Sequence, residues 1–209
     1  MELHRIQSLF DPFYEFFLDG LQAGFPPDEQ TALSLVHRIV RDWTQGTAVE
    51  ELSRDMRLLV ALDDHGEPFG LAMWRSVGER IAHLWYLWVT TARRDQGLGA
   101  WLYTAVRQQA REAMPGARLF TFEVERSDQA VSPHQAEYAL RRIGFYRRLG
   151  AKMALNVDFV LDCGREGASP LPMHLMAHTW DDVAEAEVLD LLAECYGQSM
   201  VRPPTLELA

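Results

Sequence analysis

The chain has 209 residues, of which 48% are hydrophobic and 24% charged, a balance typical of one globular domain with or without an appendage. Its formal net charge of −10 argues against nucleic acid as a partner, because phosphate contacts need a basic face. The charge is compatible with a cationic amine substrate, with solubility as the alternative explanation. No apolar run approaches the roughly 20 residues that span a bilayer, and the N-terminus lacks the apolar stretch of a signal peptide. With only two cysteines, no disulfide framework is expected. We therefore expect a cytoplasmic protein without a membrane partner.

Strand and helix patterns alternate along the chain. In chain order we expect a strand over 4–9, helices from Asp11 and over 28–43, strands over 58–62, 69–76 and 81–90, a helix over 98–113, a strand over 119–125, a helix over 133–149, a strand over 153–161, a last strand over 172–178 and a helix over 181–196. The polar stretch 63–67 predicts a hairpin turn. Small residues over 163–172 predict a loop, and the tail around Arg202-Pro203-Pro204 is expected to be loosely ordered. This order is that of a mixed α/β protein.

A glycine turn stands between the strand over 81–90 and the helix over 98–113. It reads Arg-Asp-Gln-Gly-Leu-Gly-Ala from Arg94 to Ala100. Gly97 and Gly99 have no side chain to keep a ligand away, and a helix N-terminus offers unpaired N–H groups and a partial positive charge. Arg94 adds a fixed cation. The stretch therefore predicts a phosphate-binding turn, with a tight turn that binds nothing as the alternative.

Two motifs together resemble the GCN5-related N-acetyltransferases (GNAT). Arg-x-x-Gly-x-Gly, starting at Arg94, is similar to the acetyl-CoA pyrophosphate loop of that family. Phe145-Tyr146-x-x-x-Gly150 is similar to the segment that closes its later helix. The resemblance implies an acyl-CoA N-acyltransferase fold of the α/β (α+β) class, a mixed and mostly antiparallel sheet flanked by helices. It implies an acetyltransferase domain over 1–162 and a C-terminal strand-helix extension over 163–209 that packs on the same domain and can form a homodimer interface or cap a monomer.

The resemblance also implies where acetyl-CoA, the cosubstrate, binds. The pantetheine arm would pair with the backbone of Leu87, Trp88 and Val89. The pyrophosphate would lie beside Arg94, on the backbone N–H groups of Gln96, Gly97, Leu98, Gly99 and Ala100. The implied reaction is attack of a neutral primary amine on the acetyl thioester, with a small molecule or an amino-acid-like compound as the acceptor.

Four residues are candidates for proton transfer. Tyr146 matches the general acid that is frequent in the family, and a phenol can donate a proton to a forming thiolate. His83 stands where histone-type members carry a glutamate base, although a strand histidine can equally be structural. Glu123 and Glu125 are rivals; being two apart on a strand, they share a face, and one buried carboxylate beside the other would have a raised pKa. They can equally bind a cationic substrate or face solvent.

Other features leave alternatives open. Ala139 and Arg142 depart from many members of the family, which have Asn and Ala at these positions. Four arginines on the later helix can meet phosphates or form a solvated face: Arg141, Arg142, Arg147 and Arg148. The aromatic residues can form an ammonium cage or a core: Trp74, Trp85, Tyr86 and Trp88. The histidines show no metal-ligand spacing, so we predict no metal.

Three other functions compete with small-molecule acetylation. A protein or peptide amine can be the acceptor, which would require an open groove. The chain can be a catalytically weak acyl-CoA-binding module. A different nucleotide-binding protein is disfavoured, because the turn lacks the Gly-Lys-Ser/Thr ending of a P-loop and the Gly-x-Gly-x-x-Gly of a dinucleotide fold.

Overall fold

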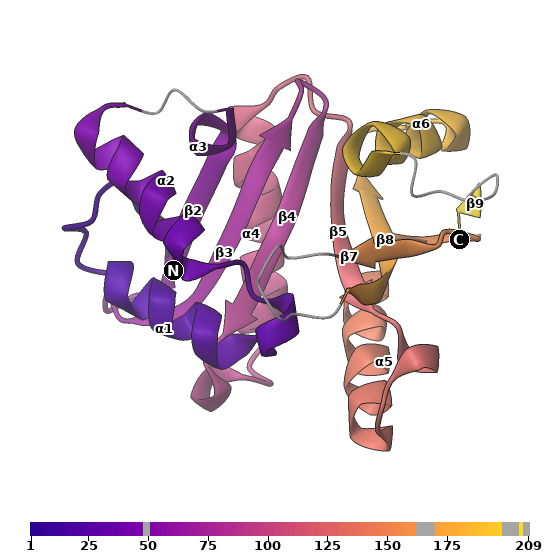
Figure 1. Ribbon diagram of the computed structural model, residues 1–209, viewed down its shortest axis with the longest axis horizontal. Coiled ribbons are helices and arrows are strands. Elements are labelled where there is room, and N and C mark those ends of the chain that lie inside the picture. The colour runs from indigo at the N-terminus through magenta and orange to yellow at the C-terminus, as the bar shows by residue number, and fades with distance from the viewer. Residues whose placement is uncertain (48–50, 162–169, 198–204, 207–209) are drawn as a thin grey trace. The chain divides into compact units, whose positions relative to one another are not determined.

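The computed structural model describes residues 1–47, 51–161, 170–197 and 205–206 (Figure 1). Most of the expected loop over 163–172, with Cys163, and the tail around Arg202 lie outside these residues. The chain divides into two compact units. The described part of the first comprises 1–47, 51–76 and 84–115, and that of the second comprises 77–83, 116–161, 170–197 and 205–206.

The first unit begins with a strand and helices, continues with an antiparallel hairpin and ends with the glycine turn and its helix. Its elements are β1 (Glu2–Arg5), α1 (Tyr14–Gly24), a 3-10 turn (Pro27–Glu29), α2 (Leu33–Gln45), α3 (Glu51–Asp55), β2 (Met56–Leu62), β3 (Pro68–Val77), β4 (Ile81–Val89), a second 3-10 turn (Thr91–Arg93) and α4 (Leu98–Ala113). Strand β2 pairs antiparallel with both β1 and β3. The last residue of β3 and the first three of β4 belong to the second unit.

Alternation along β2 and β3 explains how helices cover this sheet. Leu58 and Val60 of β2 point toward α1 and α2 and form one core with Phe17, Val36 and Val40. Trp74, on the other face of β3, donates from its ring N–H to Gln109 of α4. The strands therefore lie between α1 and α2 on one face and α4 on the other (Figure 1).

The second unit contains the remaining strands. Its elements are β5 (Leu119–Glu125), a 3-10 turn (Ser127–Gln129), α5 (Pro133–Arg148), β6 (Lys152–Leu155), β7 (Phe159–Leu161), β8 (Leu171–Thr179), α6 (Glu185–Tyr196) and β9 (Thr205–Leu206). Strand β8 pairs antiparallel with β5, β6 and β7, and β6 pairs with β9. The start of β4, Ile81–His83, pairs parallel with Leu119–Thr121 of β5. Strand β8, from the C-terminal part of the chain, thus lies between β5 and β6.

The fold class predicted from the sequence is confirmed: the sheet is mixed, mostly antiparallel and flanked by helices. Helix α4 and strand β5 have the predicted bounds. The strand expected over 153–161 is instead two strands, because Asn156 adopts a left-handed conformation (φ 58°) between them. Helix α2 begins later than expected, at Leu33, because Pro27 starts a separate 3-10 turn, and the five-residue α3 was not predicted. In the described part of the chain, no helix is both long and apolar enough to cross a membrane.

Candidate functional site

The glycine turn joins the end of β4 to the start of α4. The backbone N–H of Thr90 bonds to the carbonyl of Phe69 at 2.9 Å, which fixes the end of β4 against β3. Asp95 (φ 60°) and Gly97 (φ 76°) then adopt left-handed conformations. Around Gly97, apart from its two chain neighbours, no atom of the described residues lies within 4 Å of where a Cβ would be. The glycine is therefore required by the backbone, and the space above it is open.

The N-terminus of α4 has no side-chain cap. Gly97 occupies the N-cap position and offers no acceptor, and the N–H of Trp101 closes the first helical bond onto the Gly97 carbonyl at 3.1 Å. The N–H groups from Leu98 to Ala100 come before that bond and have no helical carbonyl to pair with. Arg94 is exposed, and its Nε donates to the Val89 carbonyl at 3.4 Å. Uncapped N–H groups, the helix dipole and a nearby cation together favour a bound anion.

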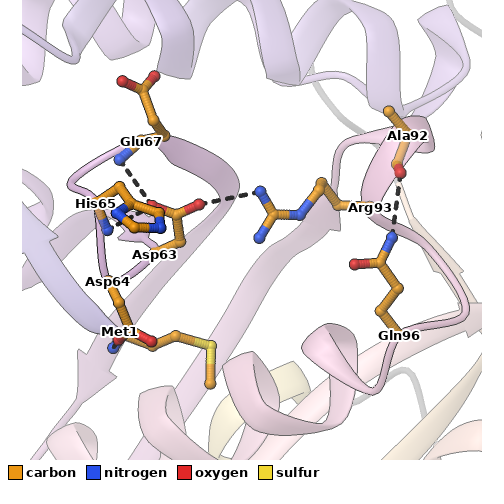
Figure 2. A network of polar contacts seen from close by, with 8 residues as sticks. All are labelled: Met1, Asp63, Asp64, His65, Glu67, Ala92, Arg93 and Gln96. Atoms are coloured by element: carbon orange, nitrogen blue, oxygen red, sulfur yellow. Dashed lines mark hydrogen bonds and ion pairs between the residues drawn. The ribbon is translucent and has the colours of Figure 1, made fainter.

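A polar network ties this turn to the β2–β3 hairpin (Figure 2). The Arg93 guanidinium lies 3.1 Å from the Asp63 carboxylate and stacks over the Phe69 ring. The same carboxylate accepts the backbone N–H groups of His65 and Glu67. The pKa of Asp63 is lowered most by the hydrogen bond from the His65 N–H, then by that from Arg93 and then by that from the Glu67 N–H. The sequence analysis identified the hairpin turn but not its contact with Arg93, which only the folded chain brings close.

The aromatic residues of β3 and β4 pack in the core or bond to the backbone. A Cβ at Gly24 would lie only 2.4 Å from the Trp88 ring, so α1 approaches Trp88 closely. Tyr86 donates its hydroxyl to the Glu29 carbonyl at 2.8 Å and accepts the Thr31 N–H at 2.6 Å. The Arg75 guanidinium lies over the Trp85 ring. Of the two roles left open by the sequence, core packing is the one that these contacts fit.

In the second unit, His83 and Glu123 form a buried ion pair. His83 Nε2 lies 2.8 Å from a Glu123 oxygen, and the side chains are 11% and 9% exposed. Tyr196 of α6 completes the cluster: its hydroxyl donates to Glu123, and its ring meets that of His83 at a centroid distance of 5.3 Å. The Cys195 thiol also hydrogen-bonds to His83.

The pair changes the titration of both members. Burial alone lowers the pKa of His83, but attraction to Glu123 and hydrogen bonds to Cys195 and Glu123 raise it to about 10. Burial alone raises the pKa of Glu123, but the charge of His83 and bonds from His83 and Tyr196 bring the net pKa below its ordinary value. The raised carboxylate pKa expected from the sequence is therefore wrong for Glu123, because its neighbour is a cation rather than a second carboxylate.

A second cluster contains Glu125, Arg142 and Tyr146. Tyr146 is buried, and its ring packs on Phe122 at 4.3 Å. Arg142 pairs with one Glu125 oxygen and hydrogen-bonds to the Tyr146 hydroxyl. Burial raises the pKa of Tyr146, and Arg142 acts in the opposite direction. The other Glu125 oxygen is buried and finds no hydrogen-bond partner among the described residues.

The structure thus places the candidates from the sequence in separate groups. The two carboxylates, two residues apart on β5, have partners from different elements: β4 and α6 for Glu123, α5 for Glu125. Sequence reasoning missed the contacts of Tyr196 and Asp63, for which no local signal exists. The residue at position 142 was a signal, because an arginine stands where many members of the family that the chain resembles have alanine. Among the described residues, no group of three or more His, Cys, Asp or Glu side chains is placed to hold a metal ion.

Comparison with known proteins adds a family and a set of similar folds. A model of the acetyltransferase (GNAT) family matches residues 7–151. No protein of curated function matches the chain in sequence. A protein from Bacteroides thetaiotaomicron, described as an acetyltransferase of the GNAT family, is 24% identical, with 94% of this chain and 99% of that chain covered and a TM-score of 0.64.

Two further solved structures carry a ligand of one chemical kind. An aminoglycoside 6'-N-acetyltransferase complexed with coenzyme A is 18% identical, with 88% of this chain and 99% of that chain covered and a TM-score of 0.54. A GNAT family acetyltransferase from Elizabethkingia anophelis with acetyl-CoA bound is 12% identical, with 86% and 97% covered and a TM-score of 0.54. At these identities the likeness establishes the fold.

Proposed function

Because the chain belongs to the acetyltransferase (GNAT) family, whose cosubstrate is acetyl-CoA, we propose that it transfers the acetyl group to the primary amine of a small molecule or an amino-acid-like acceptor. One observation carries the proposal: the uncapped N-terminus of α4 at Gly97, with open space above it and Arg94 beside it. This is the arrangement that a pyrophosphate needs, because it combines unpaired donors, a favourable dipole and a cation.

In this proposal the end of β4 and the glycine turn bind the cosubstrate. The pyrophosphate accepts backbone N–H groups from Gln96, Gly97, Leu98, Gly99 and Ala100, with Arg94 as the cation. The pantetheine amides pair with the backbone of Leu87, Trp88 and Val89. Side chains matter little for such pairing, which is consistent with Trp88 being packed against α1. The Asp63–Arg93 ion pair supports the turn without contacting the ligand.

Proton transfer is assigned to residues of α5 and β5. Tyr146 donates its proton to the coenzyme A sulfur as the thioester breaks. Among the three other candidates we assign the role of general base for the acceptor amine to Glu125. One of its oxygens is buried and unpartnered among the described residues, and this oxygen can bind the ammonium and take its proton. His83 and Glu123 are each other's partners, and His83 keeps its proton at neutral pH, so this pair is assigned a structural role.

A small cationic amine is the acceptor class to test first. One protein of the same fold is an aminoglycoside 6'-N-acetyltransferase, and a net charge of −10 favours a cationic substrate over an anionic one. Peptide N-termini and lysine side chains form the second arm of the test. The cytoplasmic location and the homodimer expected from the sequence remain predictions.

Thermal unfolding with and without acetyl-CoA tests the binding site. At a ligand concentration one hundred times Kd, binding stabilises by about 2.7 kcal/mol, which raises Tm by about 5–10 °C for a chain of this size. Gly97→Glu should abolish the shift, because it places a negative charge and a side chain in the anion site. Gly46→Glu is the matched control, since Gly46 also has a positive φ and open surroundings but lies at the end of α2.

The control separates ligand binding from backbone strain. Both variants should lower Tm without ligand, and only Gly46→Glu should keep the ligand-induced shift. No shift in the wild type at millimolar acetyl-CoA would overturn the proposal. A shift without transfer to any amine or peptide would instead favour an acyl-CoA-binding module.

A further inference from the structure

Tyr146 is a buried phenol in a setting that opposes the loss of its proton. Only 5% of the residue is exposed, and its ring lies against Phe122 and Phe145. A phenolate in such surroundings would lose its hydration, so the phenol would be a poor acid unless a positive charge lay close to its oxygen. The required charge must come from a residue that reaches the hydroxyl.

Arg142 reaches it because of helical spacing. Residues 142 and 146 are one turn apart on α5 and therefore share a face. The Arg142 guanidinium hydrogen-bonds to the Tyr146 hydroxyl, pairs with Glu125 and lies over the Tyr138 ring, 5.9 Å from its centroid. A guanidinium has five donors in a rigid fork, so it can hold a carboxylate and a phenol oxygen at once. Two anchors besides Tyr146 fix its orientation.

Arg142 differs in this from the other arginines of α5. Arg141, Arg147 and Arg148 are exposed, whereas the Arg142 side chain is only 21% exposed. The Glu125 side chain is buried to the same extent, so the pair is screened by solvent less than a surface ion pair. The four arginines are therefore not one solvated face, because one of them turns inward to Tyr146.

We propose that Arg142 is a positioning residue for Tyr146: its guanidinium holds the phenol oxygen in place and stabilises the phenolate that forms during acetyl transfer. The inference rests on the proposed function. In the step concerned, the amine nitrogen bonds to the acetyl carbon and the carbon–sulfur bond breaks. The phenol O–H bond breaks as the S–H bond of coenzyme A forms, and the electron pair stays on the phenol oxygen. Glu125 takes the first proton of the ammonium before the attack, and the second proton, which the nitrogen loses after the attack, restores the phenol.

Glu125 acts in the opposite direction on the same oxygen. Its negative charge raises the pKa of Tyr146, while that of Arg142 lowers it. Arg142→Gln and Glu125→Gln, which remove these charges, should therefore shift the pKa of the Tyr146 phenol in opposite directions. If Arg142 and Glu125 only packed around Tyr146, the two pKa shifts would not have opposite signs, because loss of packing would change the pKa in the same direction in both variants.

Titration of a labelled phenol tests the inference without any turnover. Tyr146→fluorotyrosine, with fluorine on the ring, gives a phenol that is more acidic than tyrosine and has its own fluorine NMR signal. In this background, Arg142→Gln should raise the phenol pKa by about 1–3 units, and Glu125→Gln should lower it. Arg148→Gln removes the same charge from an exposed site of the same helix and should shift the pKa by less than about half a unit. Circular dichroism checks that each variant is folded.

Equal pKa values in the Arg142→Gln and Arg148→Gln proteins would overturn the inference. So would shifts of the same sign for Arg142→Gln and Glu125→Gln. If Arg142→Gln does not fold, Arg142→Lys is the alternative, since it keeps the charge but loses the fork. Its charge should keep the pKa of the Tyr146 phenol close to the wild-type value. A pKa as high as that of an Arg142→Met protein would count against the proposal.

Steady-state kinetics then separate this inference from the function on which it rests. Arg142→Gln should lower kcat by about tenfold or more and leave KM for acetyl-CoA within about twofold, because the anion site on α4 is untouched. A wild type that binds acetyl-CoA and acetylates no acceptor would refute the proposed function and leave the phenol titration to stand. A normal kcat in Arg142→Gln, with an active wild type, would refute the positioning role alone.

Discussion

The buried pair of His83 and Glu123 predicts how the stability of the protein depends on pH. In the folded chain the pKa of His83 is raised from 6.5 to about 10. Between these two values the folded protein holds one proton that the unfolded chain has released. The free energy of unfolding must therefore fall as the pH rises from 6.5, and the contribution of the pair is fully present only below that value.

The size of the effect follows from the shift. One proton of difference changes the free energy of unfolding by about 1.4 kcal/mol for each pH unit. Between about pH 6.5 and pH 9 the wild type should therefore lose about 3 kcal/mol from this site. Glu123 has a lowered pKa, so its contribution is present above its ordinary value of 4.5 and is lost as the pH falls through the lowered value. The pair stabilises fully only between the two limits.

Urea unfolding followed by circular dichroism at several pH values measures this. Other groups titrate in the same range, so the informative quantity is the difference between the wild type and His83→Gln. In Glu123→Gln, burial acts on His83 without an opposing charge, so the imidazole should be neutral at pH 7 and the slope should disappear. The double variant completes the cycle and gives the coupling between the two side chains.

Parallel stability curves for the wild type and His83→Gln would refute the reasoning. They would mean that His83 does not hold an extra proton in the folded state, and His83 would again be a candidate base. NMR of the imidazole protons gives a direct check, since a raised pKa keeps the ring protonated well above pH 7.

Three further predictions concern other parts of the chain. Tyr146→Phe should lower kcat by about a hundredfold with little change in KM for acetyl-CoA; an unchanged kcat in steady-state assays would remove Tyr146 from the mechanism. Asp63→Asn should weaken acetyl-CoA binding about three- to tenfold in calorimetric titrations, because Arg93 loses a charged partner and the turn before α4 is less fixed, whereas Asp64→Asn, at an exposed pair with the N-terminus, should not. Gly24→Ala should destabilise the protein by about 1–3 kcal/mol in urea unfolding, since its Cβ would meet the Trp88 ring at 2.4 Å. Gly144→Ala should instead stabilise it by about 0.5–1 kcal/mol, because Gly144 lies within α5 and a Cβ there meets only the end of the Arg148 side chain. Changes of equal sign in the two variants would contradict this account of the glycines.

Local signals made several elements predictable from the sequence. The bounds of α4 were predicted because glycine before it and Pro-Gly after it bracket a run of helical spacing. Helix α5 begins at Pro133, and Ser132 accepts the N–H of Gln135 as its N-cap, as the Ser-Pro pair indicates. The glycine turn was recognisable for the same reason, since glycines directly before a helix leave its first N–H groups open to an anion. Each of these features is decided within a few residues along the chain.

The fold class, the glycine turn and the set of side chains available for proton transfer all follow from the amino-acid sequence. How those side chains are paired follows only from the folded chain. His83 meets Glu123 across 40 residues because β4 pairs with β5 in one register, and Arg142 meets Glu125 across 17 because α5 packs beside the end of β5. Whether a carboxylate lies beside a cation or another carboxylate reverses the direction of its pKa shift. The chemistry of each candidate therefore depends on contacts that no local pattern encodes.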